Sequence, residues 1–292
     1  MAKRKAVKRK SKSATIRNII VVSDTHCGCR LGLCPPHGAS LDDGGGYKPS
    51  RLQAVVWSWW REFWDEWVPH ATHGEPFCVV MNGDMVEGVH HGSTSQISNN
   101  LEDQAAIAYE VFSPIVELCG GRFYMIRGTG AHVGQQAVDE ERLAKRLGAI
   151  PNEDGQYSRY ELWKHFGDAG DPKLAHFNHH IGTTSSSAHE VSAVNAELSA
   201  AFVEAGRWGN KPPDVICRSH RHRQSEIRIP SQHGVAIAFV TAAWQLKGQF
   251  AYKVAGARQT TPQIGGSLIR QSDDEELYTR HFVRDIGRSK PE

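Results

Sequence analysis

Carboxylate and imidazole side chains directly follow several apolar segments of this sequence. The first example is Asp24-Thr25-His26, which follows the apolar run 19–22, a pattern typical of a strand buried on both faces of a sheet. In open α/β sheets, ligands bind at the carboxyl ends of the strands. A single Asp-x-His triplet is also typical of a capped turn. Its recurrence favours a shared site built from Asp24 and His26, Asp84, His132, His179 and His180, and His220 and His222.

The histidines are numerous and clustered. The chain has 16 of them, and they gather at His176, His179 and His180 and again at His220 and His222. Neutral imidazole is the commonest metal-binding side chain at neutral pH. Imidazoles combined with carboxylates suit manganese, iron, zinc or nickel. These residue types therefore predict a site for divalent metal ions.

Alternating strand-like and helix-like segments must position these side chains. The spacing of apolar residues predicts helices over 51–68, 102–119, 139–147 and 188–204. Five tryptophans of segment 51–68 recur at helical spacing and are predicted to pack onto a sheet, with base stacking as the alternative. Pro69 is expected to end that helix. Apolar runs predict strands over 19–22, 77–81, 122–126, 157–163, 173–178, 214–217, 235–243 and 277–283.

Five short motifs occur in order between residues 18 and 245, each after a strand-like run: D-T-H, G-D-M-V-E-G, G-T-G-A-H, N-H-H and S-H-R-H. This series resembles the signature of the calcineurin-like metallophosphoesterase superfamily, which reads D-x-H, G-D-x-x-(D/E), G-N-H-(D/E), a single His and G-H-x-H. Bacteriophage and prophage members look similar, with a Gly-Thr-x-x-His variant of the third motif. The resemblance implies one domain over residues 18–292 with an α/β fold, a four-layer α/β/β/α sandwich.

The resemblance also implies a binuclear metal centre. Two divalent ions are expected, Mn²⁺ first and Fe, Zn or Ni as alternatives. A hydroxide bridging them would attack phosphorus in line while both ions stabilise the developing charge. One ion would be held by Asp24, His26 and His222. Asp84 would bridge both ions. The second ion would also be held by His179 and His220.

The third motif departs from the family pattern. Thr129 stands where the family has an asparagine that binds the second ion, and a hydroxyl is a poorer metal ligand than an amide carbonyl. The second site is therefore expected to be weaker, or completed by water or another side chain. The next histidine comes three residues later, and the resemblance implies that His132 is the general acid that protonates the leaving oxygen. The alternative is a histidine that merely lines the loop.

Other residues near these motifs have less certain roles. Of the adjacent pair His179 and His180, the resemblance favours His179 as the ligand and leaves His180 to contact substrate. Glu87 is expected to support a ligand by a hydrogen bond rather than bind metal itself. Arg127 and Arg221 flank the motifs and are candidates to receive a phosphate oxygen, although either could be an ordinary ion-paired arginine.

A loop rich in cysteine follows the first motif. Its Cys27, Cys29, Cys34 and His37 do not have the spacing of common zinc sites. Reduced cysteines in a loop that lines the site are the preferred interpretation over a separate structural zinc.

The N-terminal segment differs in charge from the rest of the chain. Residues 1–17 contain eight Lys or Arg and no acid; without them the net charge falls from +2 to −6. Such a tail is expected to be disordered, and it would either bind nucleic acid through phosphates or act as a solubilising segment. No apolar run approaches the ~20 residues of a membrane span, and no signal peptide is visible. We expect a cytoplasmic protein, in the host cytoplasm if the chain is phage-encoded, with no membrane partner.

The sequence thus predicts a metal-dependent phosphoesterase acting on phosphate mono- or diesters. Its substrate would be a nucleic acid, a nucleotide or a phosphorylated protein. The alternative is a catalytically weak or inactive protein of the same fold that binds nucleic acid, which the altered third motif favours. A third hypothesis is a hydrolase that uses one metal ion only.

Overall fold

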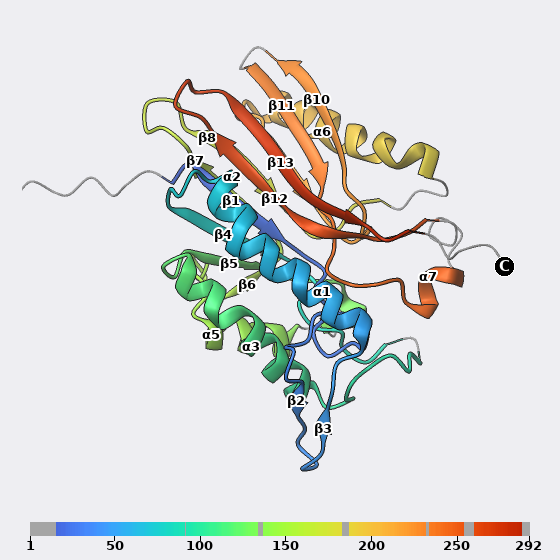
Figure 1. Cartoon of the computed structure of the whole chain (residues 1–292). Coiled ribbons are helices and arrows are strands. Elements are labelled where there is room, and N and C mark those ends of the chain that lie inside the picture. The colour runs from blue at the N-terminus through green and yellow to red at the C-terminus, as the bar shows by residue number, and fades with distance from the viewer. Residues whose placement is uncertain are drawn as a thin grey trace, which may run out of the picture.

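Two β-sheets face each other, and helices cover the outer face of each (Figure 1). The structure is a computed structural model that describes residues 16–90, 92–133, 137–182, 187–231, 234–253 and 260–287. The predicted tail, residues 1–17, therefore lies outside the described residues except for Ile16 and Arg17. Arg17 forms ion pairs with Asp168 and Asp273, so the described chain begins on the folded body.

The first sheet has six strands. Its strands β1, β4, β5 and β6 run parallel, whereas β12 is antiparallel to β1 and β13 is antiparallel to β12. The order across the sheet is β13 (Leu277–Asp285), β12 (Gln263–Gln271), β1 (Asn18–Val22), β4 (Phe77–Asn82), β5 (Phe123–Ile126) and β6 (Ser158–Arg159).

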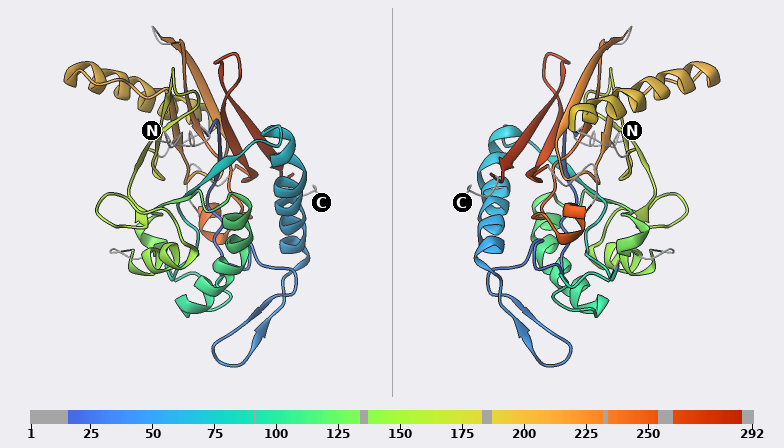
Figure 2. Two further views of the ribbon diagram at one scale, coloured as in Figure 1. Left: turned by 90° about the vertical axis from the view of Figure 1, so that its left-hand side faces the viewer. Right: turned by 90° about the vertical axis from the view of Figure 1, so that its right-hand side faces the viewer.

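The second sheet has five strands. Its inner pairs β11–β9 and β9–β8 are parallel, and both edge strands are antiparallel to their neighbours. The order is β10 (Ser225–Ser231), β11 (Gly234–Val240), β9 (Val215–Arg218), β8 (Lys173–Phe177) and β7 (Leu162–Phe166). A small hairpin of β2 (Ala39–Ser40) and β3 (Gly46–Tyr47) projects away from the body (Figure 2).

The helices lie on the outer faces of the sheets. A capping box between Ser50 and Gln53 begins α1, in which the Ser50 side chain accepts from Gln53 N and the Gln53 side chain accepts from Ser50 N. The helical segments are α1 (Arg51–Glu62), a π-helical turn (Phe63–Trp67), α2 (Val68–Ala71), α3 (Leu101–Leu118), α4 (Gly130–Val133), α5 (Val138–Leu147), a 3₁₀ turn (Ser187–His189), α6 (Glu190–Trp208) and α7 (Gln249–Lys253).

Three apolar layers hold the sandwich together and confirm the predicted four-layer α/β/β/α order. Along β1, Ile20 and Val22 face the helices α1, α3 and α5, while Ile19 and Val21 face the second sheet. The third layer packs α6 on the outer face of the second sheet. Trp60 and Trp64 are buried in the first layer, as the helical spacing of the tryptophans predicted. Because β1 is buried on both faces, its polar continuation is fixed in position.

Several element predictions were wrong in detail. Segment 157–163 is two strands in different sheets, β6 and β7, because the chain crosses between the sheets at Tyr160 and Glu161. Pro69 does not end the helical segment; it lies in the first turn of α2, where its missing N–H needs no partner. Strands β10 and β12 were not predicted. Among the described residues, no helix is both long and apolar enough to cross a bilayer.

A chain of polar contacts joins the two sheets near β13. Glu226 of β10 lies 2.8 Å from His281 Nε2 of β13, and His281 Nδ1 lies 2.9 Å from Ser267 Oγ of β12. Ser267 is fully buried and bonds to the Thr241 hydroxyl, so these contacts tie the sheets together and do not face a substrate. Burial works against the ionised Glu226, but bonds from His281, Thr279 and Arg228 outweigh it and lower its pKa to about 2.

Glu226→Gln should therefore change the acid stability of the fold. A carboxyl whose pKa is depressed in the native state contributes stability that is fully present above its unfolded pKa near 4.5 and is lost as the pH falls towards 2. The part of the difference in unfolding free energy between the native protein and the variant that depends on pH should be at most about 3 kcal/mol at neutral pH, less the screening by solvent of this partly exposed carboxyl, and it should shrink through this window. Urea unfolding at a series of pH values measures it. Glu153→Gln is the control, because Glu153 is exposed. A difference in unfolding free energy that does not change with pH would contradict the prediction.

Candidate metal centre

The loops that follow four strands meet at one edge of the sandwich. β1 leads to Asp24, β4 to Asp84, β8 to His179 and β9 to His220. Backbone bonds join the loops in pairs: Asp24 N donates to Gly83 O at 3.0 Å, and Ser219 N donates to His179 O at 3.0 Å. A bond from His220 N to Asp24 Oδ2 at 3.3 Å connects the two sheets. The structure thus brings the predicted ligands together.

The backbone at these residues is strained. Eight non-glycine residues of the described chain have a positive φ, and five of them are predicted ligands. Left-handed conformations cost energy in residues other than glycine, and they gather where the surrounding structure enforces them for function. The five are Asp24, His26, Asp84, His220 and His222.

The first group of donors consists of Asp24, His26 and His222, whose candidate ligand atoms lie within 4.8 Å of one another. His222 Nε2 is 3.2 Å from Asp24 Oδ1, and His26 Nε2 is 4.0 Å from the same oxygen. Among the described residues, the buried His26 Nε2 makes no hydrogen bond. Buried polar atoms normally have partners, so this nitrogen is available to a ligand.

The second group consists of Asp84, His179 and His220, with the Thr129 hydroxyl between them. His179 Nε2 lies 3.0 Å from Asp84 Oδ2. Thr129 Oγ1 is 3.2 Å from Asp84 Oδ2, 3.2 Å from His179 Nε2 and 3.1 Å from His220 Nδ1. The Thr129 backbone N–H also donates to Asp84 Oδ1 at 2.6 Å. Thr129 therefore contacts every member of this group.

Hydrogen bonds at the far ring nitrogens orient three of the imidazoles. His179 Nδ1 lies 2.7 Å from Asn82 O, and His132 Nδ1 lies 2.6 Å from Glu87 O. His26 Nδ1 lies 2.9 Å from Glu87 Oε2. When Nδ1 donates to oxygen, Nε2 keeps its lone pair for a metal ion or a proton. His132 Nε2 lies 3.9 Å from Asp84 Oδ2, which places it at the centre.

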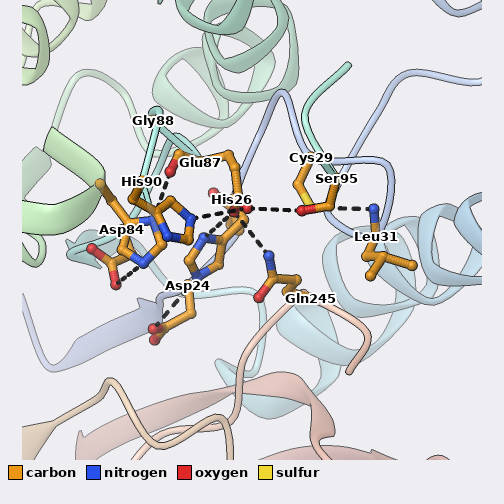
Figure 3. A network of polar contacts seen from close by, with 12 residues as sticks. Asp24, His26, Cys29, Leu31, Asp84, Glu87, Gly88, His90, Ser95 and Gln245 are labelled. Atoms are coloured by element: carbon orange, nitrogen blue, oxygen red, sulfur yellow. Dashed lines mark hydrogen bonds and ion pairs between the residues drawn. The ribbon is translucent and has the colours of Figure 1, made fainter. Parts of the chain in front are cut away.

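Glu87 organises the side of the centre near His26 (Figure 3). Its Oε2 accepts from Gln245 Nε2 at 3.0 Å, and its Oε1 lies 3.2 Å from His90 Nε2 and 3.3 Å from Ser95 Oγ. Glu87 thus hydrogen-bonds to His26, and together with His90 and His132 it also forms a candidate donor group of its own. His90, Ser95 and Gln245 were missed from the sequence because no motif contains them.

The electrostatics of the centre favour positive charge. Burial opposes the ionised form of Asp84, but His179 and His132 outweigh it and hold its pKa well below the usual range. At Asp24, His222 and His179 likewise outweigh burial and lower the pKa. Burial opposes the charged form of His179, yet Asp84 and Asp24 raise its pKa to about 10. Two buried carboxylates thus attract a cation to the space between them.

Two glycines allow the loops to approach each other. A Cβ on Gly83, which has a φ of +94°, would lie 2.3 Å from His179 Nδ1. A Cβ on Gly128 would lie 2.2 Å from Asp84 Oδ1. Behind Gly128, the fully buried Glu140 accepts from Gly128 N at 3.1 Å, and burial raises the Glu140 pKa to about 8. Glu140 therefore positions the Thr129 loop.

The remaining predicted residues occupy different surroundings. His180 is exposed, with its ring 5.1 Å from His179, so the structure brings His179 and not His180 to Asp84. Arg221 lines a cavity of about 310 Å³ in front of the centre and donates to the carbonyls of Gly182 and Glu190. Arg127 donates to Ser158 O at 2.9 Å and does not line this cavity.

The cysteines of the first loop form no disulfide. Cys27, Cys29 and Cys34 are buried free thiols, and burial raises the pKa of each to about 12. His37 lies apart on the surface and pairs with Glu110. In the described part of the chain, no candidate metal group includes a cysteine. The loop cysteines therefore act in packing, next to the Glu87 network.

These donors fit divalent transition-metal ions. Imidazole nitrogens and carboxylate oxygens are the ligands such ions prefer, and the unpartnered, buried His26 Nε2 is otherwise unexplained. One ion would be held by Asp24, His26 and His222. The other would be held by Asp84 with His179 and His220, which Thr129 also contacts.

Thr129→Val tests the second group directly. Valine keeps the branched shape and the backbone N–H bond to Asp84 but removes the hydroxyl contact to all three donors. We expect the affinity for the second divalent ion to fall about 10- to 100-fold, as for other losses of a supporting contact at metal sites. Calorimetric titration with Mn²⁺ measures both binding steps. Thr129→Ser should retain the second step, and unchanged binding in the valine variant would contradict the role of the hydroxyl.

The comparisons with known proteins leave the family open. No protein-family model matches the sequence, and the search of curated proteins finds no match. Among solved structures, Vps29 of Chaetomium thermophilum is 8% identical, with 93% of this chain and 97% of that chain covered and a TM-score of 0.38. A hypothetical protein from Thermus thermophilus is 10% identical, with 92% and 100% covered and a TM-score of 0.39.

A third solved structure is the Thermus thermophilus sulfate thiohydrolase SoxB in complex with glycerol. It is 10% identical, with 95% of this chain and 58% of that chain covered and a TM-score of 0.36. Identities and TM-scores this low carry no argument about function. The conclusions about this chain rest on its own residues.

Proposed function

We propose that this protein is a metal-dependent phosphoesterase with a binuclear centre, of the calcineurin-like type that its motifs resemble. Asp24, His26 and His222 would hold one divalent ion. His179 and His220 would help to hold the other, Asp84 would be a ligand of both, and Thr129 stands in place of the family's asparagine. Mn²⁺ is the ion we expect first, before Fe, Zn or Ni.

One observation carries this proposal. The predicted donors converge in strained, left-handed conformations, and the buried His26 Nε2 among them lacks a hydrogen-bond partner. A fold maintains strain of this kind only where the surroundings enforce it, and such sites are usually functional. Ligand binding explains both features at once.

The residues around the centre have distinct tasks. Two bound divalent ions would polarise a phosphoester and lower the pKa of water. His132 lines the cavity with Nε2 near Asp84 and is placed to give a proton to the leaving oxygen. Burial lowers the pKa of His132 to about 4, and an anionic phosphoester beside the ring would favour its protonated form. Arg221 and Arg223 line the same cavity and attract an anionic substrate.

Hydrolysis of bis-p-nitrophenyl phosphate and of the monoester, after loading with Mn²⁺, tests the proposal. Turnover that requires the metal supports a phosphoesterase, and the ratio of diester to monoester rates begins to define the substrate. Absence of turnover with both esters and with each of the four metals would contradict it.

A second candidate is a protein of this fold that binds nucleic acid without catalysis. The replacement of a metal-binding asparagine by Thr129 favours it, because a hydroxyl is the weaker ligand. The basic segment 1–17 would supply phosphate contacts, although all but two of its residues lie outside the described part. Binding of a labelled oligonucleotide together with absent metal binding would favour this candidate.

A hydrolase using one ion would instead reach full activity with one equivalent of metal.

A further inference from the structure

An exposed aromatic ring packs on a residue of the loop that leads to Thr129 and takes no part in the fold's apolar layers. Tyr160 connects β6 to β7, and 65% of its surface is exposed. The Arg127 guanidinium carbon lies 4.5 Å from the centroid of its ring. The Tyr160 carbonyl accepts from Asn178 Nδ2 at 3.0 Å. One face of the ring is thus covered by a cation, while much of the side chain remains open.

The contacts of Tyr160 lead directly to the centre. Arg127 precedes Thr129 by two residues, and Asn178 precedes His179 by one. Both Thr129 and His179 contact Asp84. None of these four residues, nor Tyr160, lines the cavity in front of the centre. Tyr160 therefore contacts residues that adjoin Thr129 and His179 in the chain, and it lies outside the lining of the cavity.

The cation beneath the ring is held in place before any ligand arrives. Arg127 N donates to Arg159 O at 2.8 Å, and Arg127 Nε donates to Ser158 O at 2.9 Å. The Arg127 side chain is only 11% exposed, so the cation beneath the ring is fixed. A preorganised aromatic surface loses little conformational entropy on binding. Flat π systems stack on such surfaces, and nucleic-acid bases do so irrespective of sequence.

The cavity supplies the complementary charge. Its lining includes three cationic residues, Arg221, Arg223 and Lys247. Its acidic lining residues are Asp84 and Glu87 at the centre, and Glu190. Arg223 Nε pairs with Glu190 at 2.7 Å. A substrate with a phosphate at the centre, further negative charge in the cavity and a flat group over Tyr160 would satisfy all three features.

We propose that Tyr160 is a base-stacking subsite and that the substrate is single-stranded nucleic acid. The assignment of the reacting phosphodiester rests on the proposed function, but the stacking does not require turnover. A single strand is specified because a base stacked within a duplex cannot offer its face to Tyr160. Arg127, buried under the ring, supports the platform rather than receiving a phosphate oxygen.

Equilibrium binding without hydrolysis tests the subsite. Fluorescence anisotropy of the full chain in EDTA, at about 150 mM salt, would compare a labelled oligothymidylate of about eight nucleotides with an abasic strand of equal length. Both strands have the same phosphates, so binding through the basic tail contributes equally to the two affinities and cancels in their ratio. The native protein should prefer the strand with bases about tenfold, as one stacked base provides.

Variants identify the residue responsible. Tyr160→Ala should abolish the preference, and Tyr160→Trp should retain it. Trp208→Ala is the matched control, because Trp208 is 75% exposed but lies at the end of α6. A preference that survives in Tyr160→Ala, or no preference in the native protein, would overturn the proposal. So would a phosphopeptide that competes better than the oligonucleotide.

The outcomes separate this inference from the proposed function. If the native protein hydrolyses bis-p-nitrophenyl phosphate but shows no preference for bases, the subsite is refuted and the phosphoesterase stands. If it hydrolyses no ester but shows a preference that depends on Tyr160, the phosphoesterase is refuted and the stacking stands.

Discussion

Asp84→Asn should remove metal-dependent hydrolysis and weaken binding of both ions. Asp84 belongs to the donor group with His179 and His220 and to a further group with His26 and His132. It contacts His179, His132 and Thr129. An amide keeps the shape but loses the negative charge that attracts cations into this buried space. We expect hydrolysis of bis-p-nitrophenyl phosphate to fall by more than the 10- to 100-fold typical of losing a supporting hydrogen bond.

Metal content and turnover should be measured on the same preparation of this variant. Asp171→Asn is the matched control, because Asp171 pairs with Lys173 in the loop before β8, remote from the centre's contacts. Far-ultraviolet circular dichroism establishes that both variants fold. Wild-type turnover in Asp84→Asn with its metal intact would show that Asp84 is not a shared ligand.

His132→Ala should slow hydrolysis according to the leaving group. The bond from His132 Nδ1 to Glu87 O leaves Nε2 to face the centre, where a leaving oxygen needs a proton. Positioned general acids contribute about 10²- to 10⁴-fold. We expect a loss of this size with a methyl or nucleoside leaving group. A much smaller loss is expected with p-nitrophenolate, which leaves as a stable anion.

The ratio between the two substrates is the decisive quantity for His132. A residue that merely supports the loop would lower both rates equally when removed. His165→Ala on β7 is the control, because His165 is exposed and contacts none of the donors. Equal losses with both leaving groups would show that His132 is not the general acid.

The meeting of the predicted ligands follows from local sequence patterns. Runs 19–22 and 77–81 were recognisable as buried strands, and they form the parallel neighbours β1 and β4. Parallel neighbours end at the same edge, so Asp24 and Asp84 had to approach each other. The choice of His179 over His180 is consistent with burial, since His179 is fully buried and His180 is exposed. The roles of these residues in metal binding stay predictions.

Other parts of the fold depend on contacts distant in the sequence. β12 lies beside β1 in the first sheet but contains Gly265 and Gly266, which weaken the pattern of a strand. Both glycines are required by packing: a Cβ would lie 1.8 Å from Phe282 O at Gly265 and 2.8 Å from Phe63 Cζ at Gly266. Close approaches of this kind become visible only when the strands are assembled.

The residues that support the centre were the hardest to predict. Gln245 reaches Glu87 across 158 positions of sequence, and no local pattern marks such a contact. Glu140 did leave a signal. It shares helical spacing with Leu143 and Leu147, which places its carboxyl on the buried face of α5. An acidic residue on an apolar helix face indicates a buried partner, here the backbone of Gly128.

The stoichiometry of bound metal tests the central claim most directly. Equilibrium dialysis of the full chain against Mn²⁺, followed by elemental analysis and electron paramagnetic resonance, reports the number of ions and their coupling. We predict two ions per chain with the spin coupling of a shared carboxylate, both weakened in Asp84→Asn. A chain that binds no Mn²⁺, Fe, Zn or Ni, or binds two ions equally well without Asp84, would contradict a centre built on that residue.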